Sequence, residues 1–169
     1  MHALCQKASV KISFMLFIIL LDQWTKIWAV KSVKGAPTQS YLGDLFRLEY
    51  AENSGAFLSF GSTMNVETRF WIFTVGVSLF LLFPAYYLFK EKSTSWVQPM
   101  AMAGVVAGGI GNLIDRIFRP NHVVVDFMNM GIGSLRTGIF NVADMAILFG
   151  VIALFFVMGK QQQLPEKKS

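Results

Sequence analysis

The sequence predicts an all-α polytopic membrane protein with four transmembrane helices. Hydrophobic residues make up 54% of the 169 residues, and charged residues only 15%. Soluble domains carry about 25% charged residues, so an ordinary soluble fold and a disordered chain are both excluded. The 16 phenylalanines and a mean hydropathy of +0.50 agree with this class.

Four apolar runs define the expected spans, at about residues 12–30, 70–89, 97–118 and 140–158. A hydrocarbon core of about 30 Å needs roughly 20 helical residues, which each run provides. We therefore expect a single membrane domain over residues 1–169, with a polar tail at 160–169. The first run leads into Asp22 and not into a small-x-small cleavage site, so it is interpreted as a retained span.

An even number of spans places both termini on one side of the membrane. The short segments on that side are dense in lysine, including Lys7, Lys11 and Lys90. The positive-inside rule then predicts cytoplasmic termini. The outer side receives two loops, at about residues 31–69 and 119–139.

The outer loops carry patterns typical of strands and turns. Residues 45–50 alternate apolar and polar side chains, and a turn at 53–55 separates them from 56–60, which predicts a hairpin. Residues 63–69 predict a short interfacial helix. In the second loop, the apolar frame 123–127 around Asp126 predicts a short strand or interfacial segment with one buried carboxylate.

Charge and composition limit the chemistry that the chain can perform. The net charge of +5 comes from 15 basic and 10 acidic residues, which basic residues at span ends explain without nucleic acid. One cysteine, Cys5, excludes an intrachain disulfide framework, and the two histidines cannot form a three-histidine zinc site. We expect no metal and no cofactor, so any catalysis depends on carboxylates, hydroxyls, lysine or the backbone.

Polar residues at membrane depth are the most informative. A charge at a helix centre costs ~2.5–3.5 kcal/mol on insertion scales, so such residues pair, face inward or lie near an interface. Spacings of three or four residues place them on shared helix faces within each span. The set comprises Asp22, Lys26, Asn112, Asp115, Arg116, Asn141 and Asp144.

Simpler interpretations of these residues remain open. The i,i+4 pair of Asp22 and Lys26 is, by itself, more often a structural ion pair than a catalytic one. Asp115 beside Arg116 can likewise hold helices in register. The stripe of small residues in the third span, which includes Gly104 and Gly108, is typical of close helix packing.

Asp126 and Asp144 together suggest a reaction. The 18 residues between them allow the second outer loop to return and set the two carboxylates side by side. Two close carboxylates share a proton and titrate as a coupled pair. One can activate a water while the other donates to a substrate carbonyl, as in aspartic proteases.

Five segments together resemble lipoprotein signal peptidase, the bacterial signal peptidase II family. They are 22–26 (DQWTK), 52–57 (ENSGAF), 111–116 (GNLIDR), 124–127 (VVDF) and 140–144 (FNVAD). They occur in the family's order, and the resemblance covers essentially the whole chain. It implies four transmembrane helices with a small outer β-cradle and a short helix along the membrane surface.

The resemblance also implies an activity and its site. Family members are aspartic endopeptidases of the bacterial inner membrane that cut diacylglyceryl-modified prolipoproteins just before the lipid-bearing cysteine, and the antibiotic globomycin blocks them. The catalytic pair corresponds to Asp126 and Asp144. Substrate-binding or supporting candidates are Asp22, Lys26, Asn53, Gly55, Asn112, Asp115, Arg116, Asn141 and Ala143. Membrane lipids are expected partners, nucleic acid is not, and the chain is expected to be a monomer.

Three other interpretations are weighed against this one. A small proton- or ion-coupled transporter could use the intramembrane charges as a relay, but they cluster at one membrane level and no internal repeat is visible. A non-enzymatic scaffold would use the same residues only to hold helices together. A Ser–Lys protease could use Ser54 or Ser59 of the first outer loop with Lys26 of the first span, but nothing in the sequence orients one toward the other.

Overall fold

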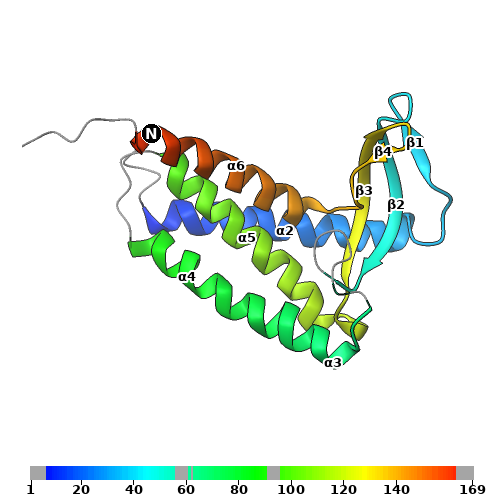
Figure 1. Ribbon diagram of the computed structural model, residues 1–169, viewed down its shortest axis with the longest axis horizontal. Helices are drawn as coiled ribbons and strands as arrows, with labels where there is room; N and C mark the ends of the chain where they lie inside the picture. The colour runs from blue at the N-terminus through cyan, green and yellow to red at the C-terminus, as the bar shows by residue number, and fades with distance from the viewer. Residues whose placement is uncertain (1–6, 56–60, 62, 91–95, 163–169) are drawn as a thin grey trace, which may run out of the picture.

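The computed structural model describes residues 7–55, 61, 63–90 and 96–162. Long antiparallel helices form a bundle, and a small sheet crosses one end of it (Figure 1). The start of α2 (Ala8–Ser32) and the end of α6 (Val142–Gln162) lie together at the opposite end. This arrangement places both described ends of the chain on one side of the bundle.

Three helices are long and apolar enough to cross a membrane, which confirms three of the four predicted spans. They are α2, the helix Val66–Lys90 and α5 (Val97–Phe118). The helix Val66–Lys90 joins α3 (Val66–Arg69), a π-helical segment η2 (Phe70–Gly76) and α4 (Val77–Lys90). The short helix expected at 63–69 is thus the first turn of the second span and not a separate interfacial element.

The fourth predicted span remains a prediction. The apolar part of α6 covers Val142–Val157, which is roughly 24 Å at 1.5 Å per residue. A hydrocarbon core is about 30 Å thick. The two residues expected to begin this span, Phe140 and Asn141, precede the helix.

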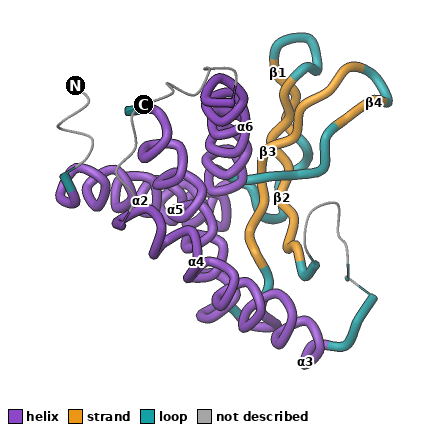
Figure 2. Tube along the Cα trace, turned by 60° about the vertical axis from the view of Figure 1, so that its left-hand side comes forward, coloured by secondary structure: helices purple, strands orange, loops and turns teal. Residues whose placement is uncertain are grey.

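The outer loops form a four-stranded antiparallel sheet in the order β1-β2-β3-β4. Its strands are β1 (Gln39–Tyr41), β2 (Phe46–Asn53), β3 (Val124–Ile132) and β4 (Leu135–Arg136). Figure 2 shows the strands together on one side of the helices. The predicted small sheet is therefore present, and the apolar frame around Asp126 is a strand as expected.

The pairing of β2 differs from the predicted hairpin. Strand β2 pairs with β1 on one side and β3 on the other, and its register with β3 shifts between Leu48 and Ala51. The expected partner, 56–60, lies outside the described residues. A core of Ala29, Val33, Val125 and Phe127 fixes the end of α2 to β3.

Helix α5 is the central helix because its small residues admit α6 at close range. A Cβ at Gly108 would collide with the carbonyl oxygen of Ala143 and lie 2.8 Å from Ile147 Cγ1. A Cβ at Gly104 would be 3.4 Å from the carbonyl oxygen of Ala146. The small-residue stripe is thus a packing surface, and it brings the polar ends of the two helices together.

Candidate active site

Asp126 and Asp144 reach the candidate site from different elements. Asp126 lies on β3 opposite Ala51 and is only 2% exposed. Asp144 lies in the first turn of α6, where the aligned peptide dipoles favour a negative charge. It is partly exposed, so it is the member of the pair that is more open to water.

Two asparagine side chains connect the carboxylates. Asn141 Nδ2 donates to Asp126 Oδ1 over 2.6 Å and to Asn112 Oδ1 over 3.1 Å. Asn112 Nδ2 donates in turn to Asp144 Oδ1 over 2.8 Å. This path of hydrogen bonds holds both carboxylates in one polar cluster, although they lie on different elements.

Asn141 also caps the start of α6. Its backbone N–H donates to Asp144 Oδ2 over 3.1 Å, and the Asp144 N–H donates to Asn141 Oδ1 over 3.0 Å. This reciprocal arrangement has the logic of a capping box, in which two free helix N–H groups are satisfied at once. The bond from Asn141 to the Asp144 carboxylate is therefore made by the backbone, which leaves the side-chain amide free to reach Asp126.

The end of β2 lies against Asp126 through Asn53. Asn53 Nδ2 donates to Asp126 Oδ2 over 3.1 Å, and its Oδ1 accepts from the Gly55 N–H over 3.0 Å. The buried guanidinium of Arg116 donates from Nη2 to the Gly55 carbonyl and from Nη1 to the His122 carbonyl over 3.2 Å. Arg116 therefore fixes the turn that holds Asn53 on the carboxyl group.

A fully buried ionic cluster lies beside the two asparagines. Lys26 Nζ is 2.8 Å from Asp22 Oδ2, 3.2 Å from Asp115 Oδ2 and 3.0 Å from Asn112 Oδ1. A buried charge that loses its partner is strongly destabilising, so the cation and its two carboxylates depend on one another. This cluster reaches the dyad through Asn112 and orients its amide.

Asp22 and Asp115 each join two elements. Asp22 Oδ1 accepts from the Ala143 N–H over 2.9 Å, so a side chain of α2 caps α6. Asp115 Oδ2 accepts from the Val125 N–H over 3.1 Å, which ties α5 to the strand next to Asp126. Glycine is required at position 111, because a Cβ there would lie 2.8 Å from Asp22 Oδ2.

The pKa of Asp126 is raised from an ordinary value of 3.8 to about 7. Burial is the main cause, because it penalises the charged form, and the negative charge of Asp144 adds to it. The hydrogen bonds from Asn53 and Asn141 oppose the shift without cancelling it. Asp126 therefore retains its proton to a much higher pH than an ordinary aspartate and is about half protonated near pH 7.

All eleven residues singled out from the sequence lie in this one connected network. Two further members were missed. Gln23 donates to Asp22 Oδ2 over 3.1 Å and to the Gly111 carbonyl over 3.0 Å, and Arg119 pairs with Asp115 Oδ1 at 2.8 Å. The i,i+4 spacing of Asp115 and Arg119 could have predicted their ion pair. Nothing in the sequence indicates the contact of Gln23 with another helix.

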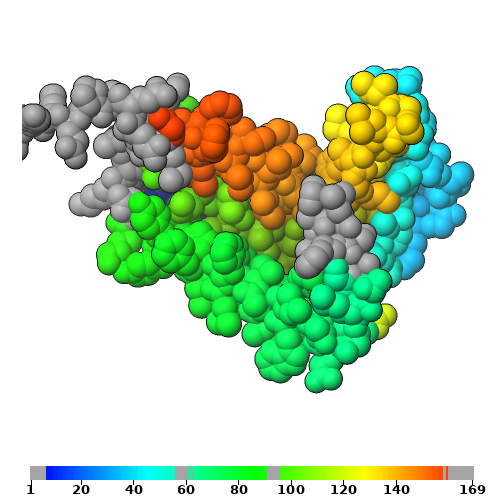
Figure 3. All heavy atoms as spheres, viewed as in Figure 1, coloured from blue at the N-terminus to red at the C-terminus, as the bar shows by residue number. Residues whose placement is uncertain are grey.

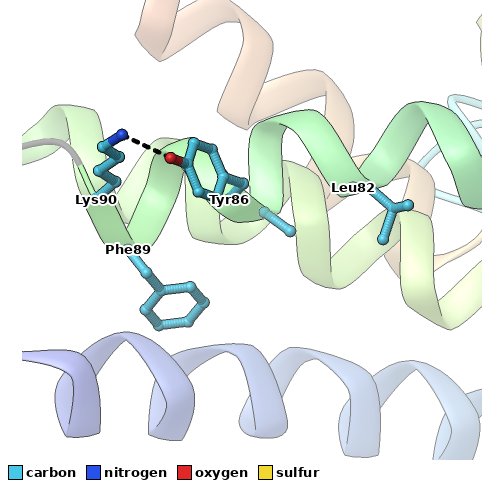
Figure 4. A pocket seen from close by; sticks show the side chains of 5 residues that line it. Leu82, Tyr86, Phe89 and Lys90 are labelled. Carbon is cyan, nitrogen blue, oxygen red and sulfur yellow. Dashed lines mark hydrogen bonds between the residues drawn. The ribbon is translucent and has the colours of Figure 1, made fainter.

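A separate apolar groove of about 570 Å³ lies along the C-terminal half of α4 (Figure 4). Leu82, Ala85, Tyr86, Phe89 and Lys90 line it, and Lys90 Nζ donates to the Tyr86 hydroxyl over 2.6 Å. It shares no residue with the polar network. Among the described residues, no group of three histidine, cysteine or acidic side chains is arranged to hold a metal.

Comparison with solved structures supports the architecture. A bacterial membrane enzyme determined by the in meso method at 2.3 Å resolution superposes with a TM-score of 0.81, covering 96% of this chain and 94% of that one at 23% identity. A second, at 1.9 Å resolution, gives a TM-score of 0.74 over 96% of each chain, also at 23% identity. At this identity the likeness shows a shared fold.

Sequence comparison identifies the family. The signal peptidase (SPase) II family profile matches residues 14–159. A lipoprotein signal peptidase of Halalkalibacterium halodurans is 38% identical over 153 residues, 90% of this chain and 94% of the relative. One from Borrelia hermsii is 35% identical over 149 residues, 85% of each chain. Because these matches span nearly the whole of each protein, the chain belongs to the signal peptidase II family.

Proposed function

We propose that this bacterial membrane protein is an aspartic endopeptidase that removes the signal peptide from diacylglyceryl-modified prolipoproteins, cutting just before the lipid-bearing cysteine. The observation that carries the proposal is the pair of Asp126 and Asp144, linked through Asn141 and Asn112. Family membership and the relatives named lipoprotein signal peptidase support the substrate class. The two linked carboxylates support a peptidase more strongly than they support the alternative of a proton- or ion-coupled transporter.

Asp144 acts as general base and Asp126 as general acid. Asp144 takes a proton from a water whose oxygen attacks the scissile carbonyl carbon, while Asp126 donates its proton to the carbonyl oxygen. The tetrahedral intermediate then collapses and the C–N bond breaks. Asp144 delivers its proton to the leaving nitrogen, and Asp126 recovers one from an intermediate hydroxyl, so both carboxyl groups return to their starting state.

The assignment of roles follows from the two environments. The acid must hold a proton at working pH, and the buried Asp126, with its pKa raised to about 7, meets this need. The base must reach water while ionised, which suits the partly exposed Asp144 at a helix N-terminus. Asn53 and Arg116 position the end of β2 over the pair, where a substrate segment would pass.

The site fits a substrate whose lipid remains in the bilayer. The acyl chains of such a substrate lie between lipids and its scissile bond near the membrane surface, the level at which α5 ends and α6 begins. We place this end at the outer face of the inner membrane, with four spans and cytoplasmic termini. The lysines at the opposite helix ends, Lys7, Lys11 and Lys90, favour that orientation.

The test is cleavage of a diacylated prolipoprotein by purified enzyme. Asp126→Asn and Asp144→Asn preserve side-chain size and are each expected to lower kcat by at least ~10²-fold, the smallest contribution usual for a general acid or base. Globomycin should abolish cleavage by the parent enzyme. Full cleavage by both variants would exclude the dyad.

The matched control is Glu67→Gln, the same chemical change at an exposed carboxylate on α3. It should leave kcat and thermal unfolding unchanged. Unfolding of the two aspartate variants must also be measured, because a scaffold role predicts lost stability instead of lost turnover. Turnover lost with folding retained supports the peptidase.

A further inference from the structure

The two hairpin ends of the sheet form one continuous surface, here called the hairpin tip (residues 41–45 and 130–135). The Gly131 N–H donates to the Leu45 carbonyl over 3.0 Å, and Arg136 Nη1 donates to the Asp44 carbonyl over 2.9 Å. The β1–β2 and β3–β4 connections therefore lie side by side, as Figure 2 shows. Side chains from both connections can act together.

The hairpin tip is apolar where a water-exposed turn would be polar. Leu42 is 80% exposed, Ile132 78% and Leu135 83%, and Tyr41 and Met130 beside them are also exposed. Large apolar side chains gathered on one exposed patch mark an interaction surface. Hairpin turns are normally filled by Gly, Asn, Asp, Ser or Pro.

Leu42 has an unfavourable backbone conformation in addition to its exposure. Its φ is 54°, in the left-handed region that Gly, Asn and Asp tolerate, and Gly43 and Asp44 follow in the same region at 64° and 72°. Its carbonyl accepts a turn hydrogen bond from the Leu45 N–H, but its side chain is 80% exposed and gains little from packing. A large apolar side chain kept exposed in an unfavourable backbone conformation favours a partner outside the chain.

An ionic cluster forms the base of the hairpin tip. Arg47 Nε lies 2.6 Å from Asp44 Oδ1, and Arg136 Nη1 lies 3.3 Å from Asp44 Oδ2. Glu49 is a further carboxylate near Arg47, so the two arginines are balanced by acidic side chains and the base of the hairpin tip is charged but close to neutral. Apolar side chains backed by charged ones suit the boundary between the acyl chains and the headgroups of a bilayer.

The hairpin tip also lies beside lipid-facing protein. Figures 1 and 3 show the β3–β4 end projecting past the start of α6, on the same side of the molecule. The outer surface of α6 is apolar and exposed, with Leu148, Phe149 and Phe155 on it. The apolar apex thus continues the surface that the bilayer covers.

We propose that the hairpin tip is a joint lipid anchor, in which Leu42, Ile132 and Leu135 enter the acyl–headgroup boundary beside α6 while Arg47 and Arg136 stay at the headgroups. The anchor holds the sheet against the membrane at the end away from its contact with α2. It does not depend on the peptidase activity. If that activity holds, the anchor keeps Asp126 of β3 at the depth of a lipid-linked substrate.

The experiment measures depth with a fluorophore on the full-length protein in vesicles of phosphatidylethanolamine and phosphatidylglycerol. Cys5→Ser removes the single native thiol, and Leu42→Cys or Leu135→Cys then carries an environment-sensitive NBD label. Lipids spin-labelled near the headgroup should quench both labels several-fold more than a label at Ala36→Cys. Ala36 is an exposed residue of the connection between α2 and β1.

Two outcomes would overturn the anchor. Quenching at both hairpin-tip positions no stronger than at Ala36 would place them in water. A blue-shifted emission without lipid quenching that disappears at high lipid-to-protein ratio would identify a second copy of the chain as the partner. Because the readout is optical, it is independent of whether the protein cleaves any substrate.

A second variant tests whether the two connections act jointly. Leu42→Asn suits the left-handed backbone, so it should not lower the unfolding temperature in detergent micelles. It should nevertheless reduce lipid quenching of the label at position 135 several-fold. Unchanged quenching there would overturn the joint anchor.

Discussion

At the scale of single residues, the environment of Asp126 sets the pH range over which the proposed mechanism can operate. Its pKa of about 7 means that the protonated form, which the proposed mechanism requires, is lost as the pH rises through neutrality. The proposed mechanism also requires a base, so the rate is expected to fall again at acid pH.

We predict a bell-shaped dependence of kcat/KM on pH, with its alkaline limb near 7. The measurement is the initial cleavage rate of a diacylated peptide from about pH 3 to about pH 9, a range that extends below the ordinary aspartate pKa and above the raised pKa of Asp126. Constant activity to the alkaline end of that range would contradict Asp126 as the acid.

Substitution of Asn53 offers a second test of the alkaline limb, because the direction in which the limb should move is known. Its amide donates to Asp126 Oδ2 and favours the charged form, so it lowers the pKa. Asn53→Ala should therefore move the alkaline limb to higher pH, whatever its effect on rate. A limb that stays in place or moves down would mean that the limb reports another group.

At the scale of elements, α2 contains two buried lysines that differ in their partners. Lys26 lies between Asp22 and Asp115. Lys11 instead donates to the Leu88 carbonyl over 2.7 Å near the end of α4, and no carboxylate pairs with it in the described part of the chain. Methionine fills a similar volume in both cases and carries no charge.

Lys26→Met is predicted to lower the free energy of unfolding by ~3–5 kcal/mol, because two buried carboxylates lose their shared cation. Lys11→Met should change it by no more than about 1 kcal/mol, the net value of one hydrogen bond. Denaturant unfolding in micelles measures both. Equal effects of the two substitutions would refute the claim that the ionic cluster is the stabilising feature.

At this scale, the sequence predicted the features that depend on a single segment of the chain. Span length and the i,i+4 pairing of Asp22 with Lys26 are properties of one helix, and both were predicted. The partner of β2 was not, because β3 lies more than 70 residues further along the chain, beyond any hairpin signal. The second role of Asp22, capping α6 through Ala143, was hidden because it depends on how α2 and α6 pack.

The sequence predicted the residues of the candidate site more completely than it predicted the fold around them. The five motif segments named its residues, but the path from Asp126 to Asp144 runs through side chains of β3, α5 and the start of α6. Which atom of Asn141 contacts which carboxylate depends on a helix cap that spacing alone does not define. Gln23 was missed because its partner, the Gly111 carbonyl, is a backbone atom of another helix.

At the scale of the whole molecule, the buried carboxyl group of Asp126 lowers stability near and above neutral pH. The folded protein binds a proton at Asp126 up to a pH of about 7, whereas an unfolded chain releases it near 3.8. Between these values the folded state holds more protons than the unfolded state, so the free energy of unfolding falls as pH rises. Above the folded pKa, the protein carries an unfavourable buried charge.

Asp126→Asn removes this titration, so we predict that it unfolds like the parent near pH 4 and is more stable than the parent near pH 8. Each pKa unit corresponds to about 1.4 kcal/mol, so the gain should reach a few kcal/mol. The measurement is the free energy of unfolding in micelles at several pH values, with Glu67→Gln as the matched exposed control. Curves for Asp126→Asn and parent that stay parallel across neutrality would contradict the raised pKa. A variant that gains stability at pH 8 while losing turnover would show that this fold maintains Asp126 for chemistry at the expense of stability.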